Sequence, residues 1–486
     1  MSVFDFYKMS GPAANVFPAE SQDKVYRRKR MQTFIAATFG YALYYVCRLS
    51  MGVMKQPLID ADLLNATQLG LIGACLYWAY AVGKLVNGFL ADASNIKRFM
   101  ATGLVISVLM NFLMGVMGVS AMSDSGISAA AGTNTALFIS FAVCWALNGW
   151  SQSMGAPPAI VSLSRWFPLK SRGTFYGFFS ASHNIGEGLS FIFVGSLVAA
   201  FSWKWGFFGA ALAGILGVVL ILFWLHDNPE SQRLAPIEVL SGEMSQEEYD
   251  RGREEMLRKA GDAKKAQQAQ TRAMQAAVIK NPGVWILALA SAFMYMSRYA
   301  INEWGVIFLQ EAKDYSLAEA SAIIGINPIL GILGTVVSGW LSDKVFKGDR
   351  KYPAFAAGVL ESIALALFLF GGPAKWVNIL AMVLFGVAIG CLIAFLGGLM
   401  AIDLVPRKAT GAALGIVGIA SYIAAGLQNV VTGFLLDNNI IDKVNSLGET
   451  VQVHDFSYVA WFWFGSAVIS FMLPVLNWKR RQQVIE

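Results

Sequence analysis

Two arginines lie deep inside long apolar stretches, at matching places in the two halves of this chain. Arg48 lies within residues 33–54, and Arg298 lies within residues 284–309. A charge inside a membrane costs free energy, with estimates from roughly 2.5 kcal/mol to above 10 kcal/mol, and arginine stays charged in proteins. A guanidinium fork matches phosphate oxygens with two parallel hydrogen bonds. One fork from each half therefore predicts a paired site for a dianionic phosphate.

A structural ion pair with an acid is the alternative for either arginine. Glu303, which follows Arg298 in the same apolar stretch, is a candidate partner. Because charged residues inside membranes usually serve function, we favour ligand binding.

Three further ionisable residues fall inside apolar stretches. Lys84 would add positive charge to the site or guide anions inward; the alternative is a lysine whose amine reaches the aqueous side. His183 would donate a hydrogen bond to phosphate; the alternative is a histidine bonded to a neighbouring helix. Glu187 follows His183 by one helical turn, so the two share a helix face. Its carboxylate would favour the charged imidazole, repel a dianion, or bind a cation or a proton.

The elements that must hold these residues are membrane helices. Of the 486 residues, 56% are hydrophobic and only 14% are charged, whereas soluble proteins carry about 25% charged residues. Apolar runs of about 20 residues predict helices that cross a bilayer, and they lack the alternation of a barrel strand. We predict an all-α membrane protein with twelve transmembrane helices, near residues 33–54, 68–91, 99–121, 136–160, 173–200, 204–226, 284–309, 317–343, 353–371, 376–402, 410–436 and 457–477.

Lysine and arginine gather in alternate connections, and this asymmetry predicts the orientation. Basic residues precede the first span and follow the second and fourth, whereas residues 60–67 and 121–135 contain none. We therefore expect a multi-pass protein of the inner cell membrane with both termini in the cytoplasm. The net charge of +6 follows from this basic rim, and no pattern predicts a nucleic-acid partner.

Other functional signals are absent from the sequence. The N-terminus does not resemble a cleaved signal peptide, and the four cysteines fall within predicted spans at spacings that fit no metal site or disulfide. There is no nucleophile–base pair or phosphate loop, and the three histidines are scattered. We expect no enzyme activity, no cofactor and no metal.

The chain repeats itself once. GFLADASNIKR (88–98) corresponds to GWLSDKVFKGDR (339–350), so Asp92 and Asp343 are separated by nearly the same interval as the two arginines. Parallel repeats of this kind place a substrate site between the halves near mid-membrane. The predicted parts are a cytoplasmic tail (1–32), a six-helix half (33–226), a cytoplasmic linker with a surface helix and a Ser245–Glu248 capping box (227–283), a second six-helix half (284–477) and a tail (478–486).

These motifs resemble those of the major facilitator superfamily and, within it, the organophosphate:phosphate antiporter family. Gly88-x-x-x-Asp92 and its copy at Asp343 resemble the loop signature of the superfamily. The resemblance to the narrower family rests on Gly40-Tyr41-Ala-Leu-Tyr44-Tyr45-x-x-Arg48, Lys84, Lys170-x-Arg172-Gly173, His183-Asn184-x-Gly186, and Tyr295-x-x-Arg298 followed by Asn302, Glu303 and Trp304.

The resemblance implies a carrier with pseudo-twofold symmetry that exchanges an organic phosphate for inorganic phosphate by alternating access. A sugar phosphate, such as hexose-6-phosphate, or glycerol-3-phosphate would be the organic substrate. We expect a monomer in the lipid bilayer. The implied substrate-binding residues are Arg48, Arg298, His183, Lys84, Tyr41, Tyr45, Tyr80, Tyr295 and Tyr422, and the implied conformational residues are Asp92, Asp343, Glu187 and Glu303, with the two aspartates stabilising the outward-facing state.

Some residues depart from the family pattern. Leu49 stands where many relatives have a second basic residue, Leu414 and Val417 replace an acid and a base of some hexose-phosphate transporters, and Glu187 replaces a small residue. Two alternatives stay open. One is a membrane sensor of external sugar phosphate, and the other is a proton-coupled transporter of another organic anion that uses Glu187, Glu303 or Glu361.

Overall fold

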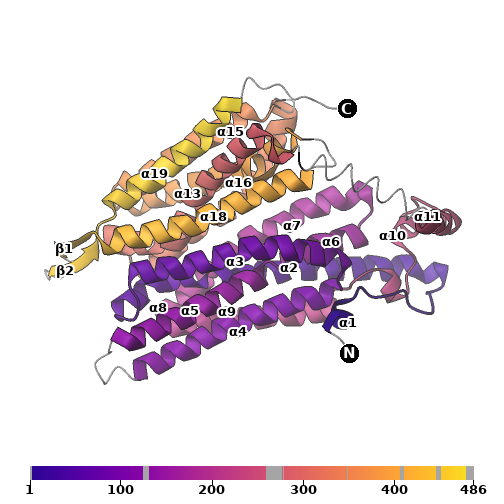
Figure 1. Ribbon diagram of the computed structural model, residues 1–486, viewed down its shortest axis with the longest axis horizontal. Coiled ribbons are helices and arrows are strands. Elements are labelled where there is room, and N and C mark those ends of the chain that lie inside the picture. The colour runs from indigo at the N-terminus through magenta and orange to yellow at the C-terminus, as the bar shows by residue number, and fades with distance from the viewer. Residues whose placement is uncertain are drawn as a thin grey trace.

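The computed structural model describes residues 3–123, 131–258, 276, 278–346, 349–405, 410–444 and 450–477. Helices form two bundles that lie one above the other in Figure 1. The first bundle consists of α1 (Val3–Tyr7), α2 (Ala19–Asp60), α3 (Ala66–Ala93), α4 (Ile96–Ser123), α5 (Ala131–Gln152), α6 (Ala156–Trp166), α7 (Leu169–Leu189), the π-helix η2 (Ser190–Val194), α8 (Gly195–Ala200) and α9 (Trp203–Trp224).

A connecting region and the second bundle follow. The connecting region contains the 3-10 helix η3 (Glu230–Gln232), α10 (Ile237–Leu240) and α11 (Gln246–Arg258). The second bundle consists of α13 (Pro282–Lys313), α14 (Leu317–Trp340), the π-helix η4 (Leu341–Val345), α15 (Lys351–Phe370), α16 (Lys375–Ala394), the π-helix η5 (Phe395–Leu399), α17 (Met400–Ile402), α18 (Thr410–Asp437), the hairpin β1 (Ile440–Val444) and β2 (Thr450–His454), α19 (Ser457–Met472) and the 3-10 helix η7 (Leu473–Asn477).

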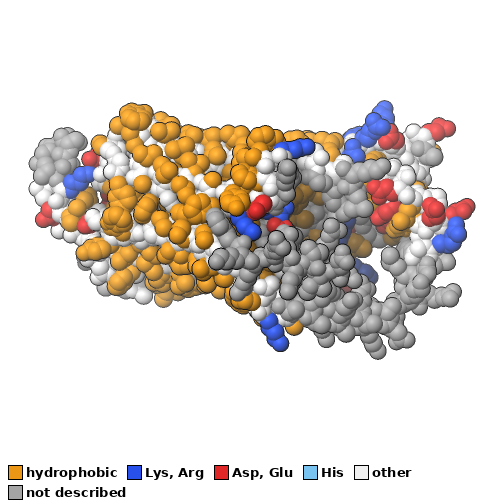
Figure 2. All heavy atoms as spheres, turned by 90° about the horizontal axis from the view of Figure 1, so that it is seen from above, with side chains coloured by type: hydrophobic (Ala, Val, Ile, Leu, Met, Phe, Trp, Pro, Cys, Tyr) orange, Lys and Arg blue, Asp and Glu red, His pale blue; other side chains and the backbone are white. Residues whose placement is uncertain are grey.

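Most helices match the predicted spans. Nine helices in the described ranges are long and apolar enough to cross a membrane, and α2, α5 and the continuous α7–η2–α8 segment occupy the remaining predicted spans. Figure 2 shows a wide apolar belt over one face, with charged side chains on either side of this belt. This distribution fits a protein whose middle lies in lipid.

Local sequence sets several helix boundaries. The predicted capping box is confirmed: Glu248 N lies 3.2 Å from Ser245 Oγ, and Ser245 N lies 2.8 Å from a Glu248 carboxylate oxygen.

The predicted span 136–160 is not one continuous helix. The helix α5 ends at Gln152, and α6 begins at Ala156 with Pro157 and Pro158 in its first turn. Proline fits that position since it has no N–H to donate. The β1–β2 hairpin was not predicted, although its residues are paired in antiparallel register.

The two bundles meet closely at the end that carries the β1–β2 hairpin, called here the hairpin end (Figure 1, left). At this end α3 and α18 cross with their backbones in contact. A Cβ added to Gly70 or Gly433 would lie 2.3 Å from the carbonyl oxygen of Asn429 or Ala66, respectively. Glycine permits such close helix crossings, so the hairpin end is closed.

The opposite end, which carries α1, α10 and α11, is called the linker end. Here the facing segments of the two bundles are separated. A Cβ added to Gly88 of α3, Gly177 of α7 or Gly415 of α18 would meet no described atom within 4 Å. Phe89 and Phe178 on the same segments are 81% and 65% exposed. The molecule is therefore closed at the hairpin end and open toward the linker end.

Candidate functional site

Arg48 lies in the middle of α2, buried to 1% exposure at the boundary between the bundles. Its Nη2 donates a hydrogen bond of 3.4 Å to the hydroxyl of Tyr299, and its Nε has no hydrogen-bond partner in the described part of the chain. Aromatic rings from both bundles surround the guanidinium. Its carbon lies 4.3 Å from the ring centre of Tyr80, 5.4 Å from those of Tyr45 and Tyr422, 5.6 Å from that of Tyr77 and 6.0 Å from that of Tyr299.

Arg298 lies in α13 and approaches Arg48 across the bundle boundary. Both guanidinium groups contact the same ring, since Arg298 lies 5.3 Å from the centre of Tyr299. Unlike Arg48, Arg298 has an acid partner: its Nη2 is 2.7 Å from Oε2 of Glu187. The structure therefore brings the two predicted arginines together and gives them different surroundings.

The acid beside Arg298 is not the one suggested by sequence proximity. Glu303 follows Arg298 by five positions in α13, which turns its side chain about 140° around the helix. Glu303 instead pairs with Lys55 of α2 at 3.0 Å and accepts a 2.5 Å hydrogen bond from Tyr77 of α3. Glu187 of α7, from the other bundle, fills the place beside Arg298 and also accepts a 2.6 Å hydrogen bond from Asn302.

Lys55 was missed by the sequence reasoning because it follows directly after the predicted span 33–54. The helix continues to Asp60, so Lys55 is buried rather than solvated. Its Nζ lies 3.7 Å from the ring centre of Trp304 and donates a 3.2 Å hydrogen bond to Asn429. The sequence signal that could have identified Lys55 is its position, one residue beyond the end of an apolar run. Lys55 and Glu303 form a second polar connection between the bundles, on the hairpin side of Arg48.

The remaining predicted binding residues lie around Arg48 or toward the linker end. Lys84 is exposed, and its Nζ lies 5.4 Å from the ring centre of Tyr422. The His183 ring is half-buried, with its centre 5.9 Å from that of Tyr45. Two of the predicted tyrosines extend the aromatic group: Tyr41 packs 5.5 Å from Tyr45, and Tyr295 packs 5.4 Å from Tyr422. The predicted residues from α2, α3, α7, α13 and α18 thus converge on one place.

The two loop-signature aspartates do not join this group. Asp92 is exposed at the linker end, where its backbone carbonyl accepts a 2.9 Å hydrogen bond from Arg165. The side chain of Asp343 lies outside the described residues. Glu361, considered for proton coupling, is buried in α15 and accepts a hydrogen bond from Ser297, the neighbour of Arg298.

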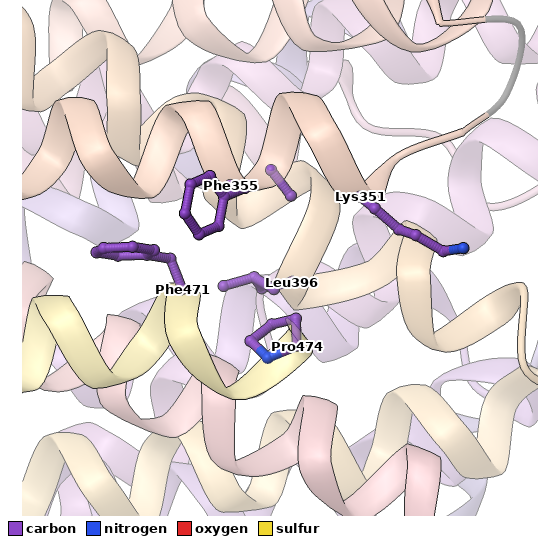
Figure 3. A pocket seen from close by; sticks show the side chains of 6 residues that line it. Lys351, Phe355, Leu396, Phe471 and Pro474 are labelled. Carbon is purple, nitrogen blue, oxygen red and sulfur yellow. The ribbon is translucent and has the colours of Figure 1, made fainter. Parts of the chain in front are cut away.

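A separate hollow lies within the second bundle at the linker end (Figure 3). It is a narrow gap between α15, η5, α19 and η7, lined by Lys351, Ala354, Phe355, Leu396, Phe471 and Pro474. Its lining is almost entirely apolar and lies apart from both arginines, so it is not part of the candidate anion site.

Comparisons with known proteins agree with this geometry. A family model described as Major Facilitator Superfamily matches residues 34–429, so the chain belongs to the major facilitator superfamily. Among solved structures, a bacterial homolog of the human lysosomal transporter Spinster, inward-facing and unoccupied, matches with a TM-score of 0.64 at 18% identity over 92% of this chain and 95% of that chain. At this identity the likeness shows the fold alone.

Relatives with higher sequence identity identify a narrower family within this superfamily. A probable hexose phosphate transport protein of Chlamydia pneumoniae is 32% identical, with 88% of this chain and 91% of the relative covered. The glycerol-3-phosphate transporter of Bacillus subtilis is also 32% identical, with coverage of 85% and 88%. The membrane sensor protein UhpC of Salmonella typhimurium is 29% identical, with coverage of 88% and 90%. The chain belongs to the organophosphate:phosphate antiporter family, whose members are transport and sensor proteins rather than enzymes.

Proposed function

We propose that this chain exchanges an organic phosphate, such as a hexose phosphate or glycerol-3-phosphate, for inorganic phosphate across the inner cell membrane. The observation that carries the proposal is Arg48, a buried guanidinium among tyrosine rings with no carboxylate partner in the described ranges. Because an uncompensated buried charge is costly, an anion from outside would stabilise it. The hexose phosphate and glycerol-3-phosphate relatives support a phosphate ester as this anion.

Alternating access of the two bundles would carry the anion across. With the linker end in the cytoplasm, as the basic connections predict, the structure corresponds to an inward-open carrier. An anion enters past Lys84, binds Arg48 among the tyrosines, and then engages Arg298 from the other bundle. This bridge draws the bundles together at the linker end. Without an anion, Arg48 would remain a buried charge with no carboxylate partner in the closed intermediate, which is costly, so the carrier moves between its two states only when loaded.

The other predicted residues have supporting roles in this proposal. Tyr45, Tyr80 and Tyr422 hold the Arg48 guanidinium through cation–π contacts and offer hydroxyls to the substrate, while His183 donates to a phosphate oxygen. Asp92, exposed in the inward-open state, pairs with basic residues when the linker end closes. The carrier acts as a monomer.

An exchange assay tests the proposal. Phosphate-loaded proteoliposomes containing the wild-type protein should take up radiolabelled phosphate. Arg48→Lys and Arg298→Lys keep the charge but lose the fork. Each should slow exchange at least about tenfold, because a hydrogen bond to a charged group contributes about 1.5–3 kcal/mol. Arg27→Lys is the matched control, since Arg27 is exposed and pairs with nearby Asp23 at 3.0 Å. Wild-type exchange by both site variants would refute the proposal.

Assays on the same vesicles can identify the organic phosphate substrate and distinguish a carrier from a sensor. Competition of labelled phosphate uptake by glucose-6-phosphate, glycerol-3-phosphate, phosphoglycerate and phosphoenolpyruvate ranks the organic substrates. A sensor, which the UhpC relatives make the second candidate, would bind one of these esters without measurable flux.

A further inference from the structure

The Glu187 carboxylate binds the Arg298 guanidinium in the way that a ligand anion would. One carboxylate oxygen lies 2.7 Å from Nη2 of Arg298, and the other accepts a 2.6 Å hydrogen bond from Asn302. The side chains of the pair are 1% and 4% exposed. Glu187 belongs to α7 in the first bundle, whereas Arg298 and Asn302 belong to α13 in the second. The carboxylate is therefore a built-in anion that holds the two bundles together.

This contact makes the arginine pair asymmetric. The Arg48 guanidinium is surrounded by tyrosine rings and donates a hydrogen bond to Tyr299, and its Nε is without a hydrogen-bond partner among the described residues. Arg298 already has its charge balanced by Glu187. A dianion that binds Arg48 first must then compete with Glu187 for the second guanidinium.

We propose that Glu187 takes up one proton from solvent when a dianionic phosphate engages Arg298, so that substrate and proton bind together. This inference rests on the proposed function. If the phosphate displaces Glu187, the carboxylate is left buried without its cation, which is costly. If the phosphate binds the free edge of the guanidinium instead, two anions share one site. Either arrangement favours the protonated acid.

The charge balance supports the same step. In the empty state Arg48, Arg298 and Glu187 together carry a net positive charge. A dianion alone would make this buried group net negative. A proton on Glu187 makes it neutral, with each arginine matched by one charge of the phosphate. Because a net charge is strongly disfavoured in a water-poor site, the neutral combination is the most stable loaded state.

The surroundings point to Glu187 as the group that takes the proton. The charged and titratable groups that surround the Arg298–Glu187 pair in the described ranges are Tyr295 and Tyr299 on α13, Tyr45 and beyond it Arg48 on α2, and His183 one turn earlier on α7. Among the described elements α14 and α6 also pack against α7, and their ionisable residues, Glu319 and Arg165, lie near the helix ends. His183 is thus the competing proton acceptor, and a variant can separate the two.

Calorimetry on the full-length protein in detergent tests the proposal. Inorganic phosphate is titrated in at a pH where it is the dianion, in two buffers with different heats of ionisation. The difference between the two binding heats gives the number of protons taken up. The wild type should take up about one proton, and its affinity should fall about tenfold per pH unit as protons become scarce. Glu187→Gln keeps the size and the hydrogen-bonding oxygen, so it should bind phosphate without proton uptake.

The controls separate the possible failures. Glu319→Gln changes an exposed carboxylate that pairs with Lys375, and it should retain wild-type proton uptake. Proton uptake that persists in Glu187→Gln would overturn the assignment to Glu187. Its loss in His183→Gln would then assign the proton to His183, and its persistence in both variants would assign it to the phosphate. Phosphate binding by the wild type without any proton uptake would overturn the inference, and this measurement needs no variant to fold. Absence of phosphate binding by the wild type would instead contradict the proposed function.

Discussion

Lys55 and Glu303 form an ion pair in the interior of the molecule, with Nζ 3.0 Å from Oε2 and side chains 0% and 3% exposed. The pair joins α2 of the first bundle to α13 of the second. Removing one partner of a buried pair leaves an uncompensated charge, which costs about 3–5 kcal/mol. We therefore predict that Lys55→Met lowers the free energy of unfolding in detergent by about this amount, measured by denaturant titration.

An exposed pair provides the comparison. Lys375 and Glu319 lie 2.9 Å apart with side chains 57% and 45% exposed, so Lys375→Met should change the free energy of unfolding by less than about 1 kcal/mol. The double variant Lys55→Met, Glu303→Gln removes both buried charges and should recover much of the loss. If the two single lysine variants lose the same stability, Lys55 and Glu303 do not interact as described.

The sequence predicts the helices and the arginine pair because each is a local signal. A charge within about 20 apolar residues is visible without any knowledge of the fold, and so is a repeated loop motif. The ion pairs are different, because each joins helices that are distant in sequence. Which acid meets Arg298 depends on how α7 and α13 are rotated, and Glu303, the nearer acid in sequence, lies on another side of its helix.

The ends of the apolar runs were also a poor guide to which residues are buried. Lys55 falls just beyond a predicted span and therefore carries the signal of a solvated residue, although α2 continues and α18 covers it. The short hairpin formed by Ile440–Val444 and Thr450–His454 has no apolar run of helical length. Its pairing depends on contacts between strands, which a search for membrane spans does not detect.

Gly433 is predicted to be essential for closing the hairpin end. A Cβ at this position would lie 2.3 Å from the carbonyl oxygen of Ala66 and 3.1 Å from Cα of Thr67. Both are backbone atoms of α3 that cannot move aside alone. Gly433→Ala should therefore force α3 and α18 apart and slow phosphate exchange strongly.

Spin labels on cysteines introduced at Phe201 and Tyr458, in a cysteine-free background, would report this opening. Both side chains are exposed at the hairpin end, one in each bundle. Gly433→Ala should lengthen the distance between the labels. Gly465→Ala in α19 is the matched control, because a Cβ there meets no described atom within 4 Å. Unchanged label distances in Gly433→Ala would show that the crossing tolerates a methyl group.

Asp437, the last residue of α18, should stabilise the same closed end. Its two carboxylate oxygens accept hydrogen bonds of 3.0 and 2.7 Å from the backbone N–H groups of Ala66 and Thr67 in the first turn of α3. An anion at a helix N-terminus contributes about 0.3–1 kcal/mol, and more when partly buried. Because this contact crosses the bundles, Asp437→Ala should shift the label-distance distribution about fivefold toward the open hairpin end, equivalent to about 1 kcal/mol. Asp455 lies at the same end, but its carboxylate accepts a hydrogen bond from Ser457 of its own bundle. Asp455→Ala should therefore shift the label-distance distribution much less.

His454 makes the stability of this end depend on pH. Burial lowers the pKa of His454, but the hydrogen bond to Glu311 at 2.8 Å and the charges of Asp437 and Asp60 outweigh it, so the pKa lies above its ordinary value. The folded protein then holds the proton more tightly than the unfolded chain, whose histidine pKa is about 6.5. This stabilisation is fully present below about pH 6.5 and is lost as the pH rises through the folded pKa.

Thermal unfolding of the wild type should therefore show a Tm that falls as the pH rises from about 6.5 through the folded pKa of His454. His454→Gln retains a polar side chain but cannot carry the charge, so its Tm should be lower at acidic pH and should lack this fall. Glu311→Gln removes the main group that raises the pKa of His454, so the fall in Tm above about pH 6.5 should shrink or disappear. The same slope in wild type and His454→Gln would show that another group is responsible for the pH dependence.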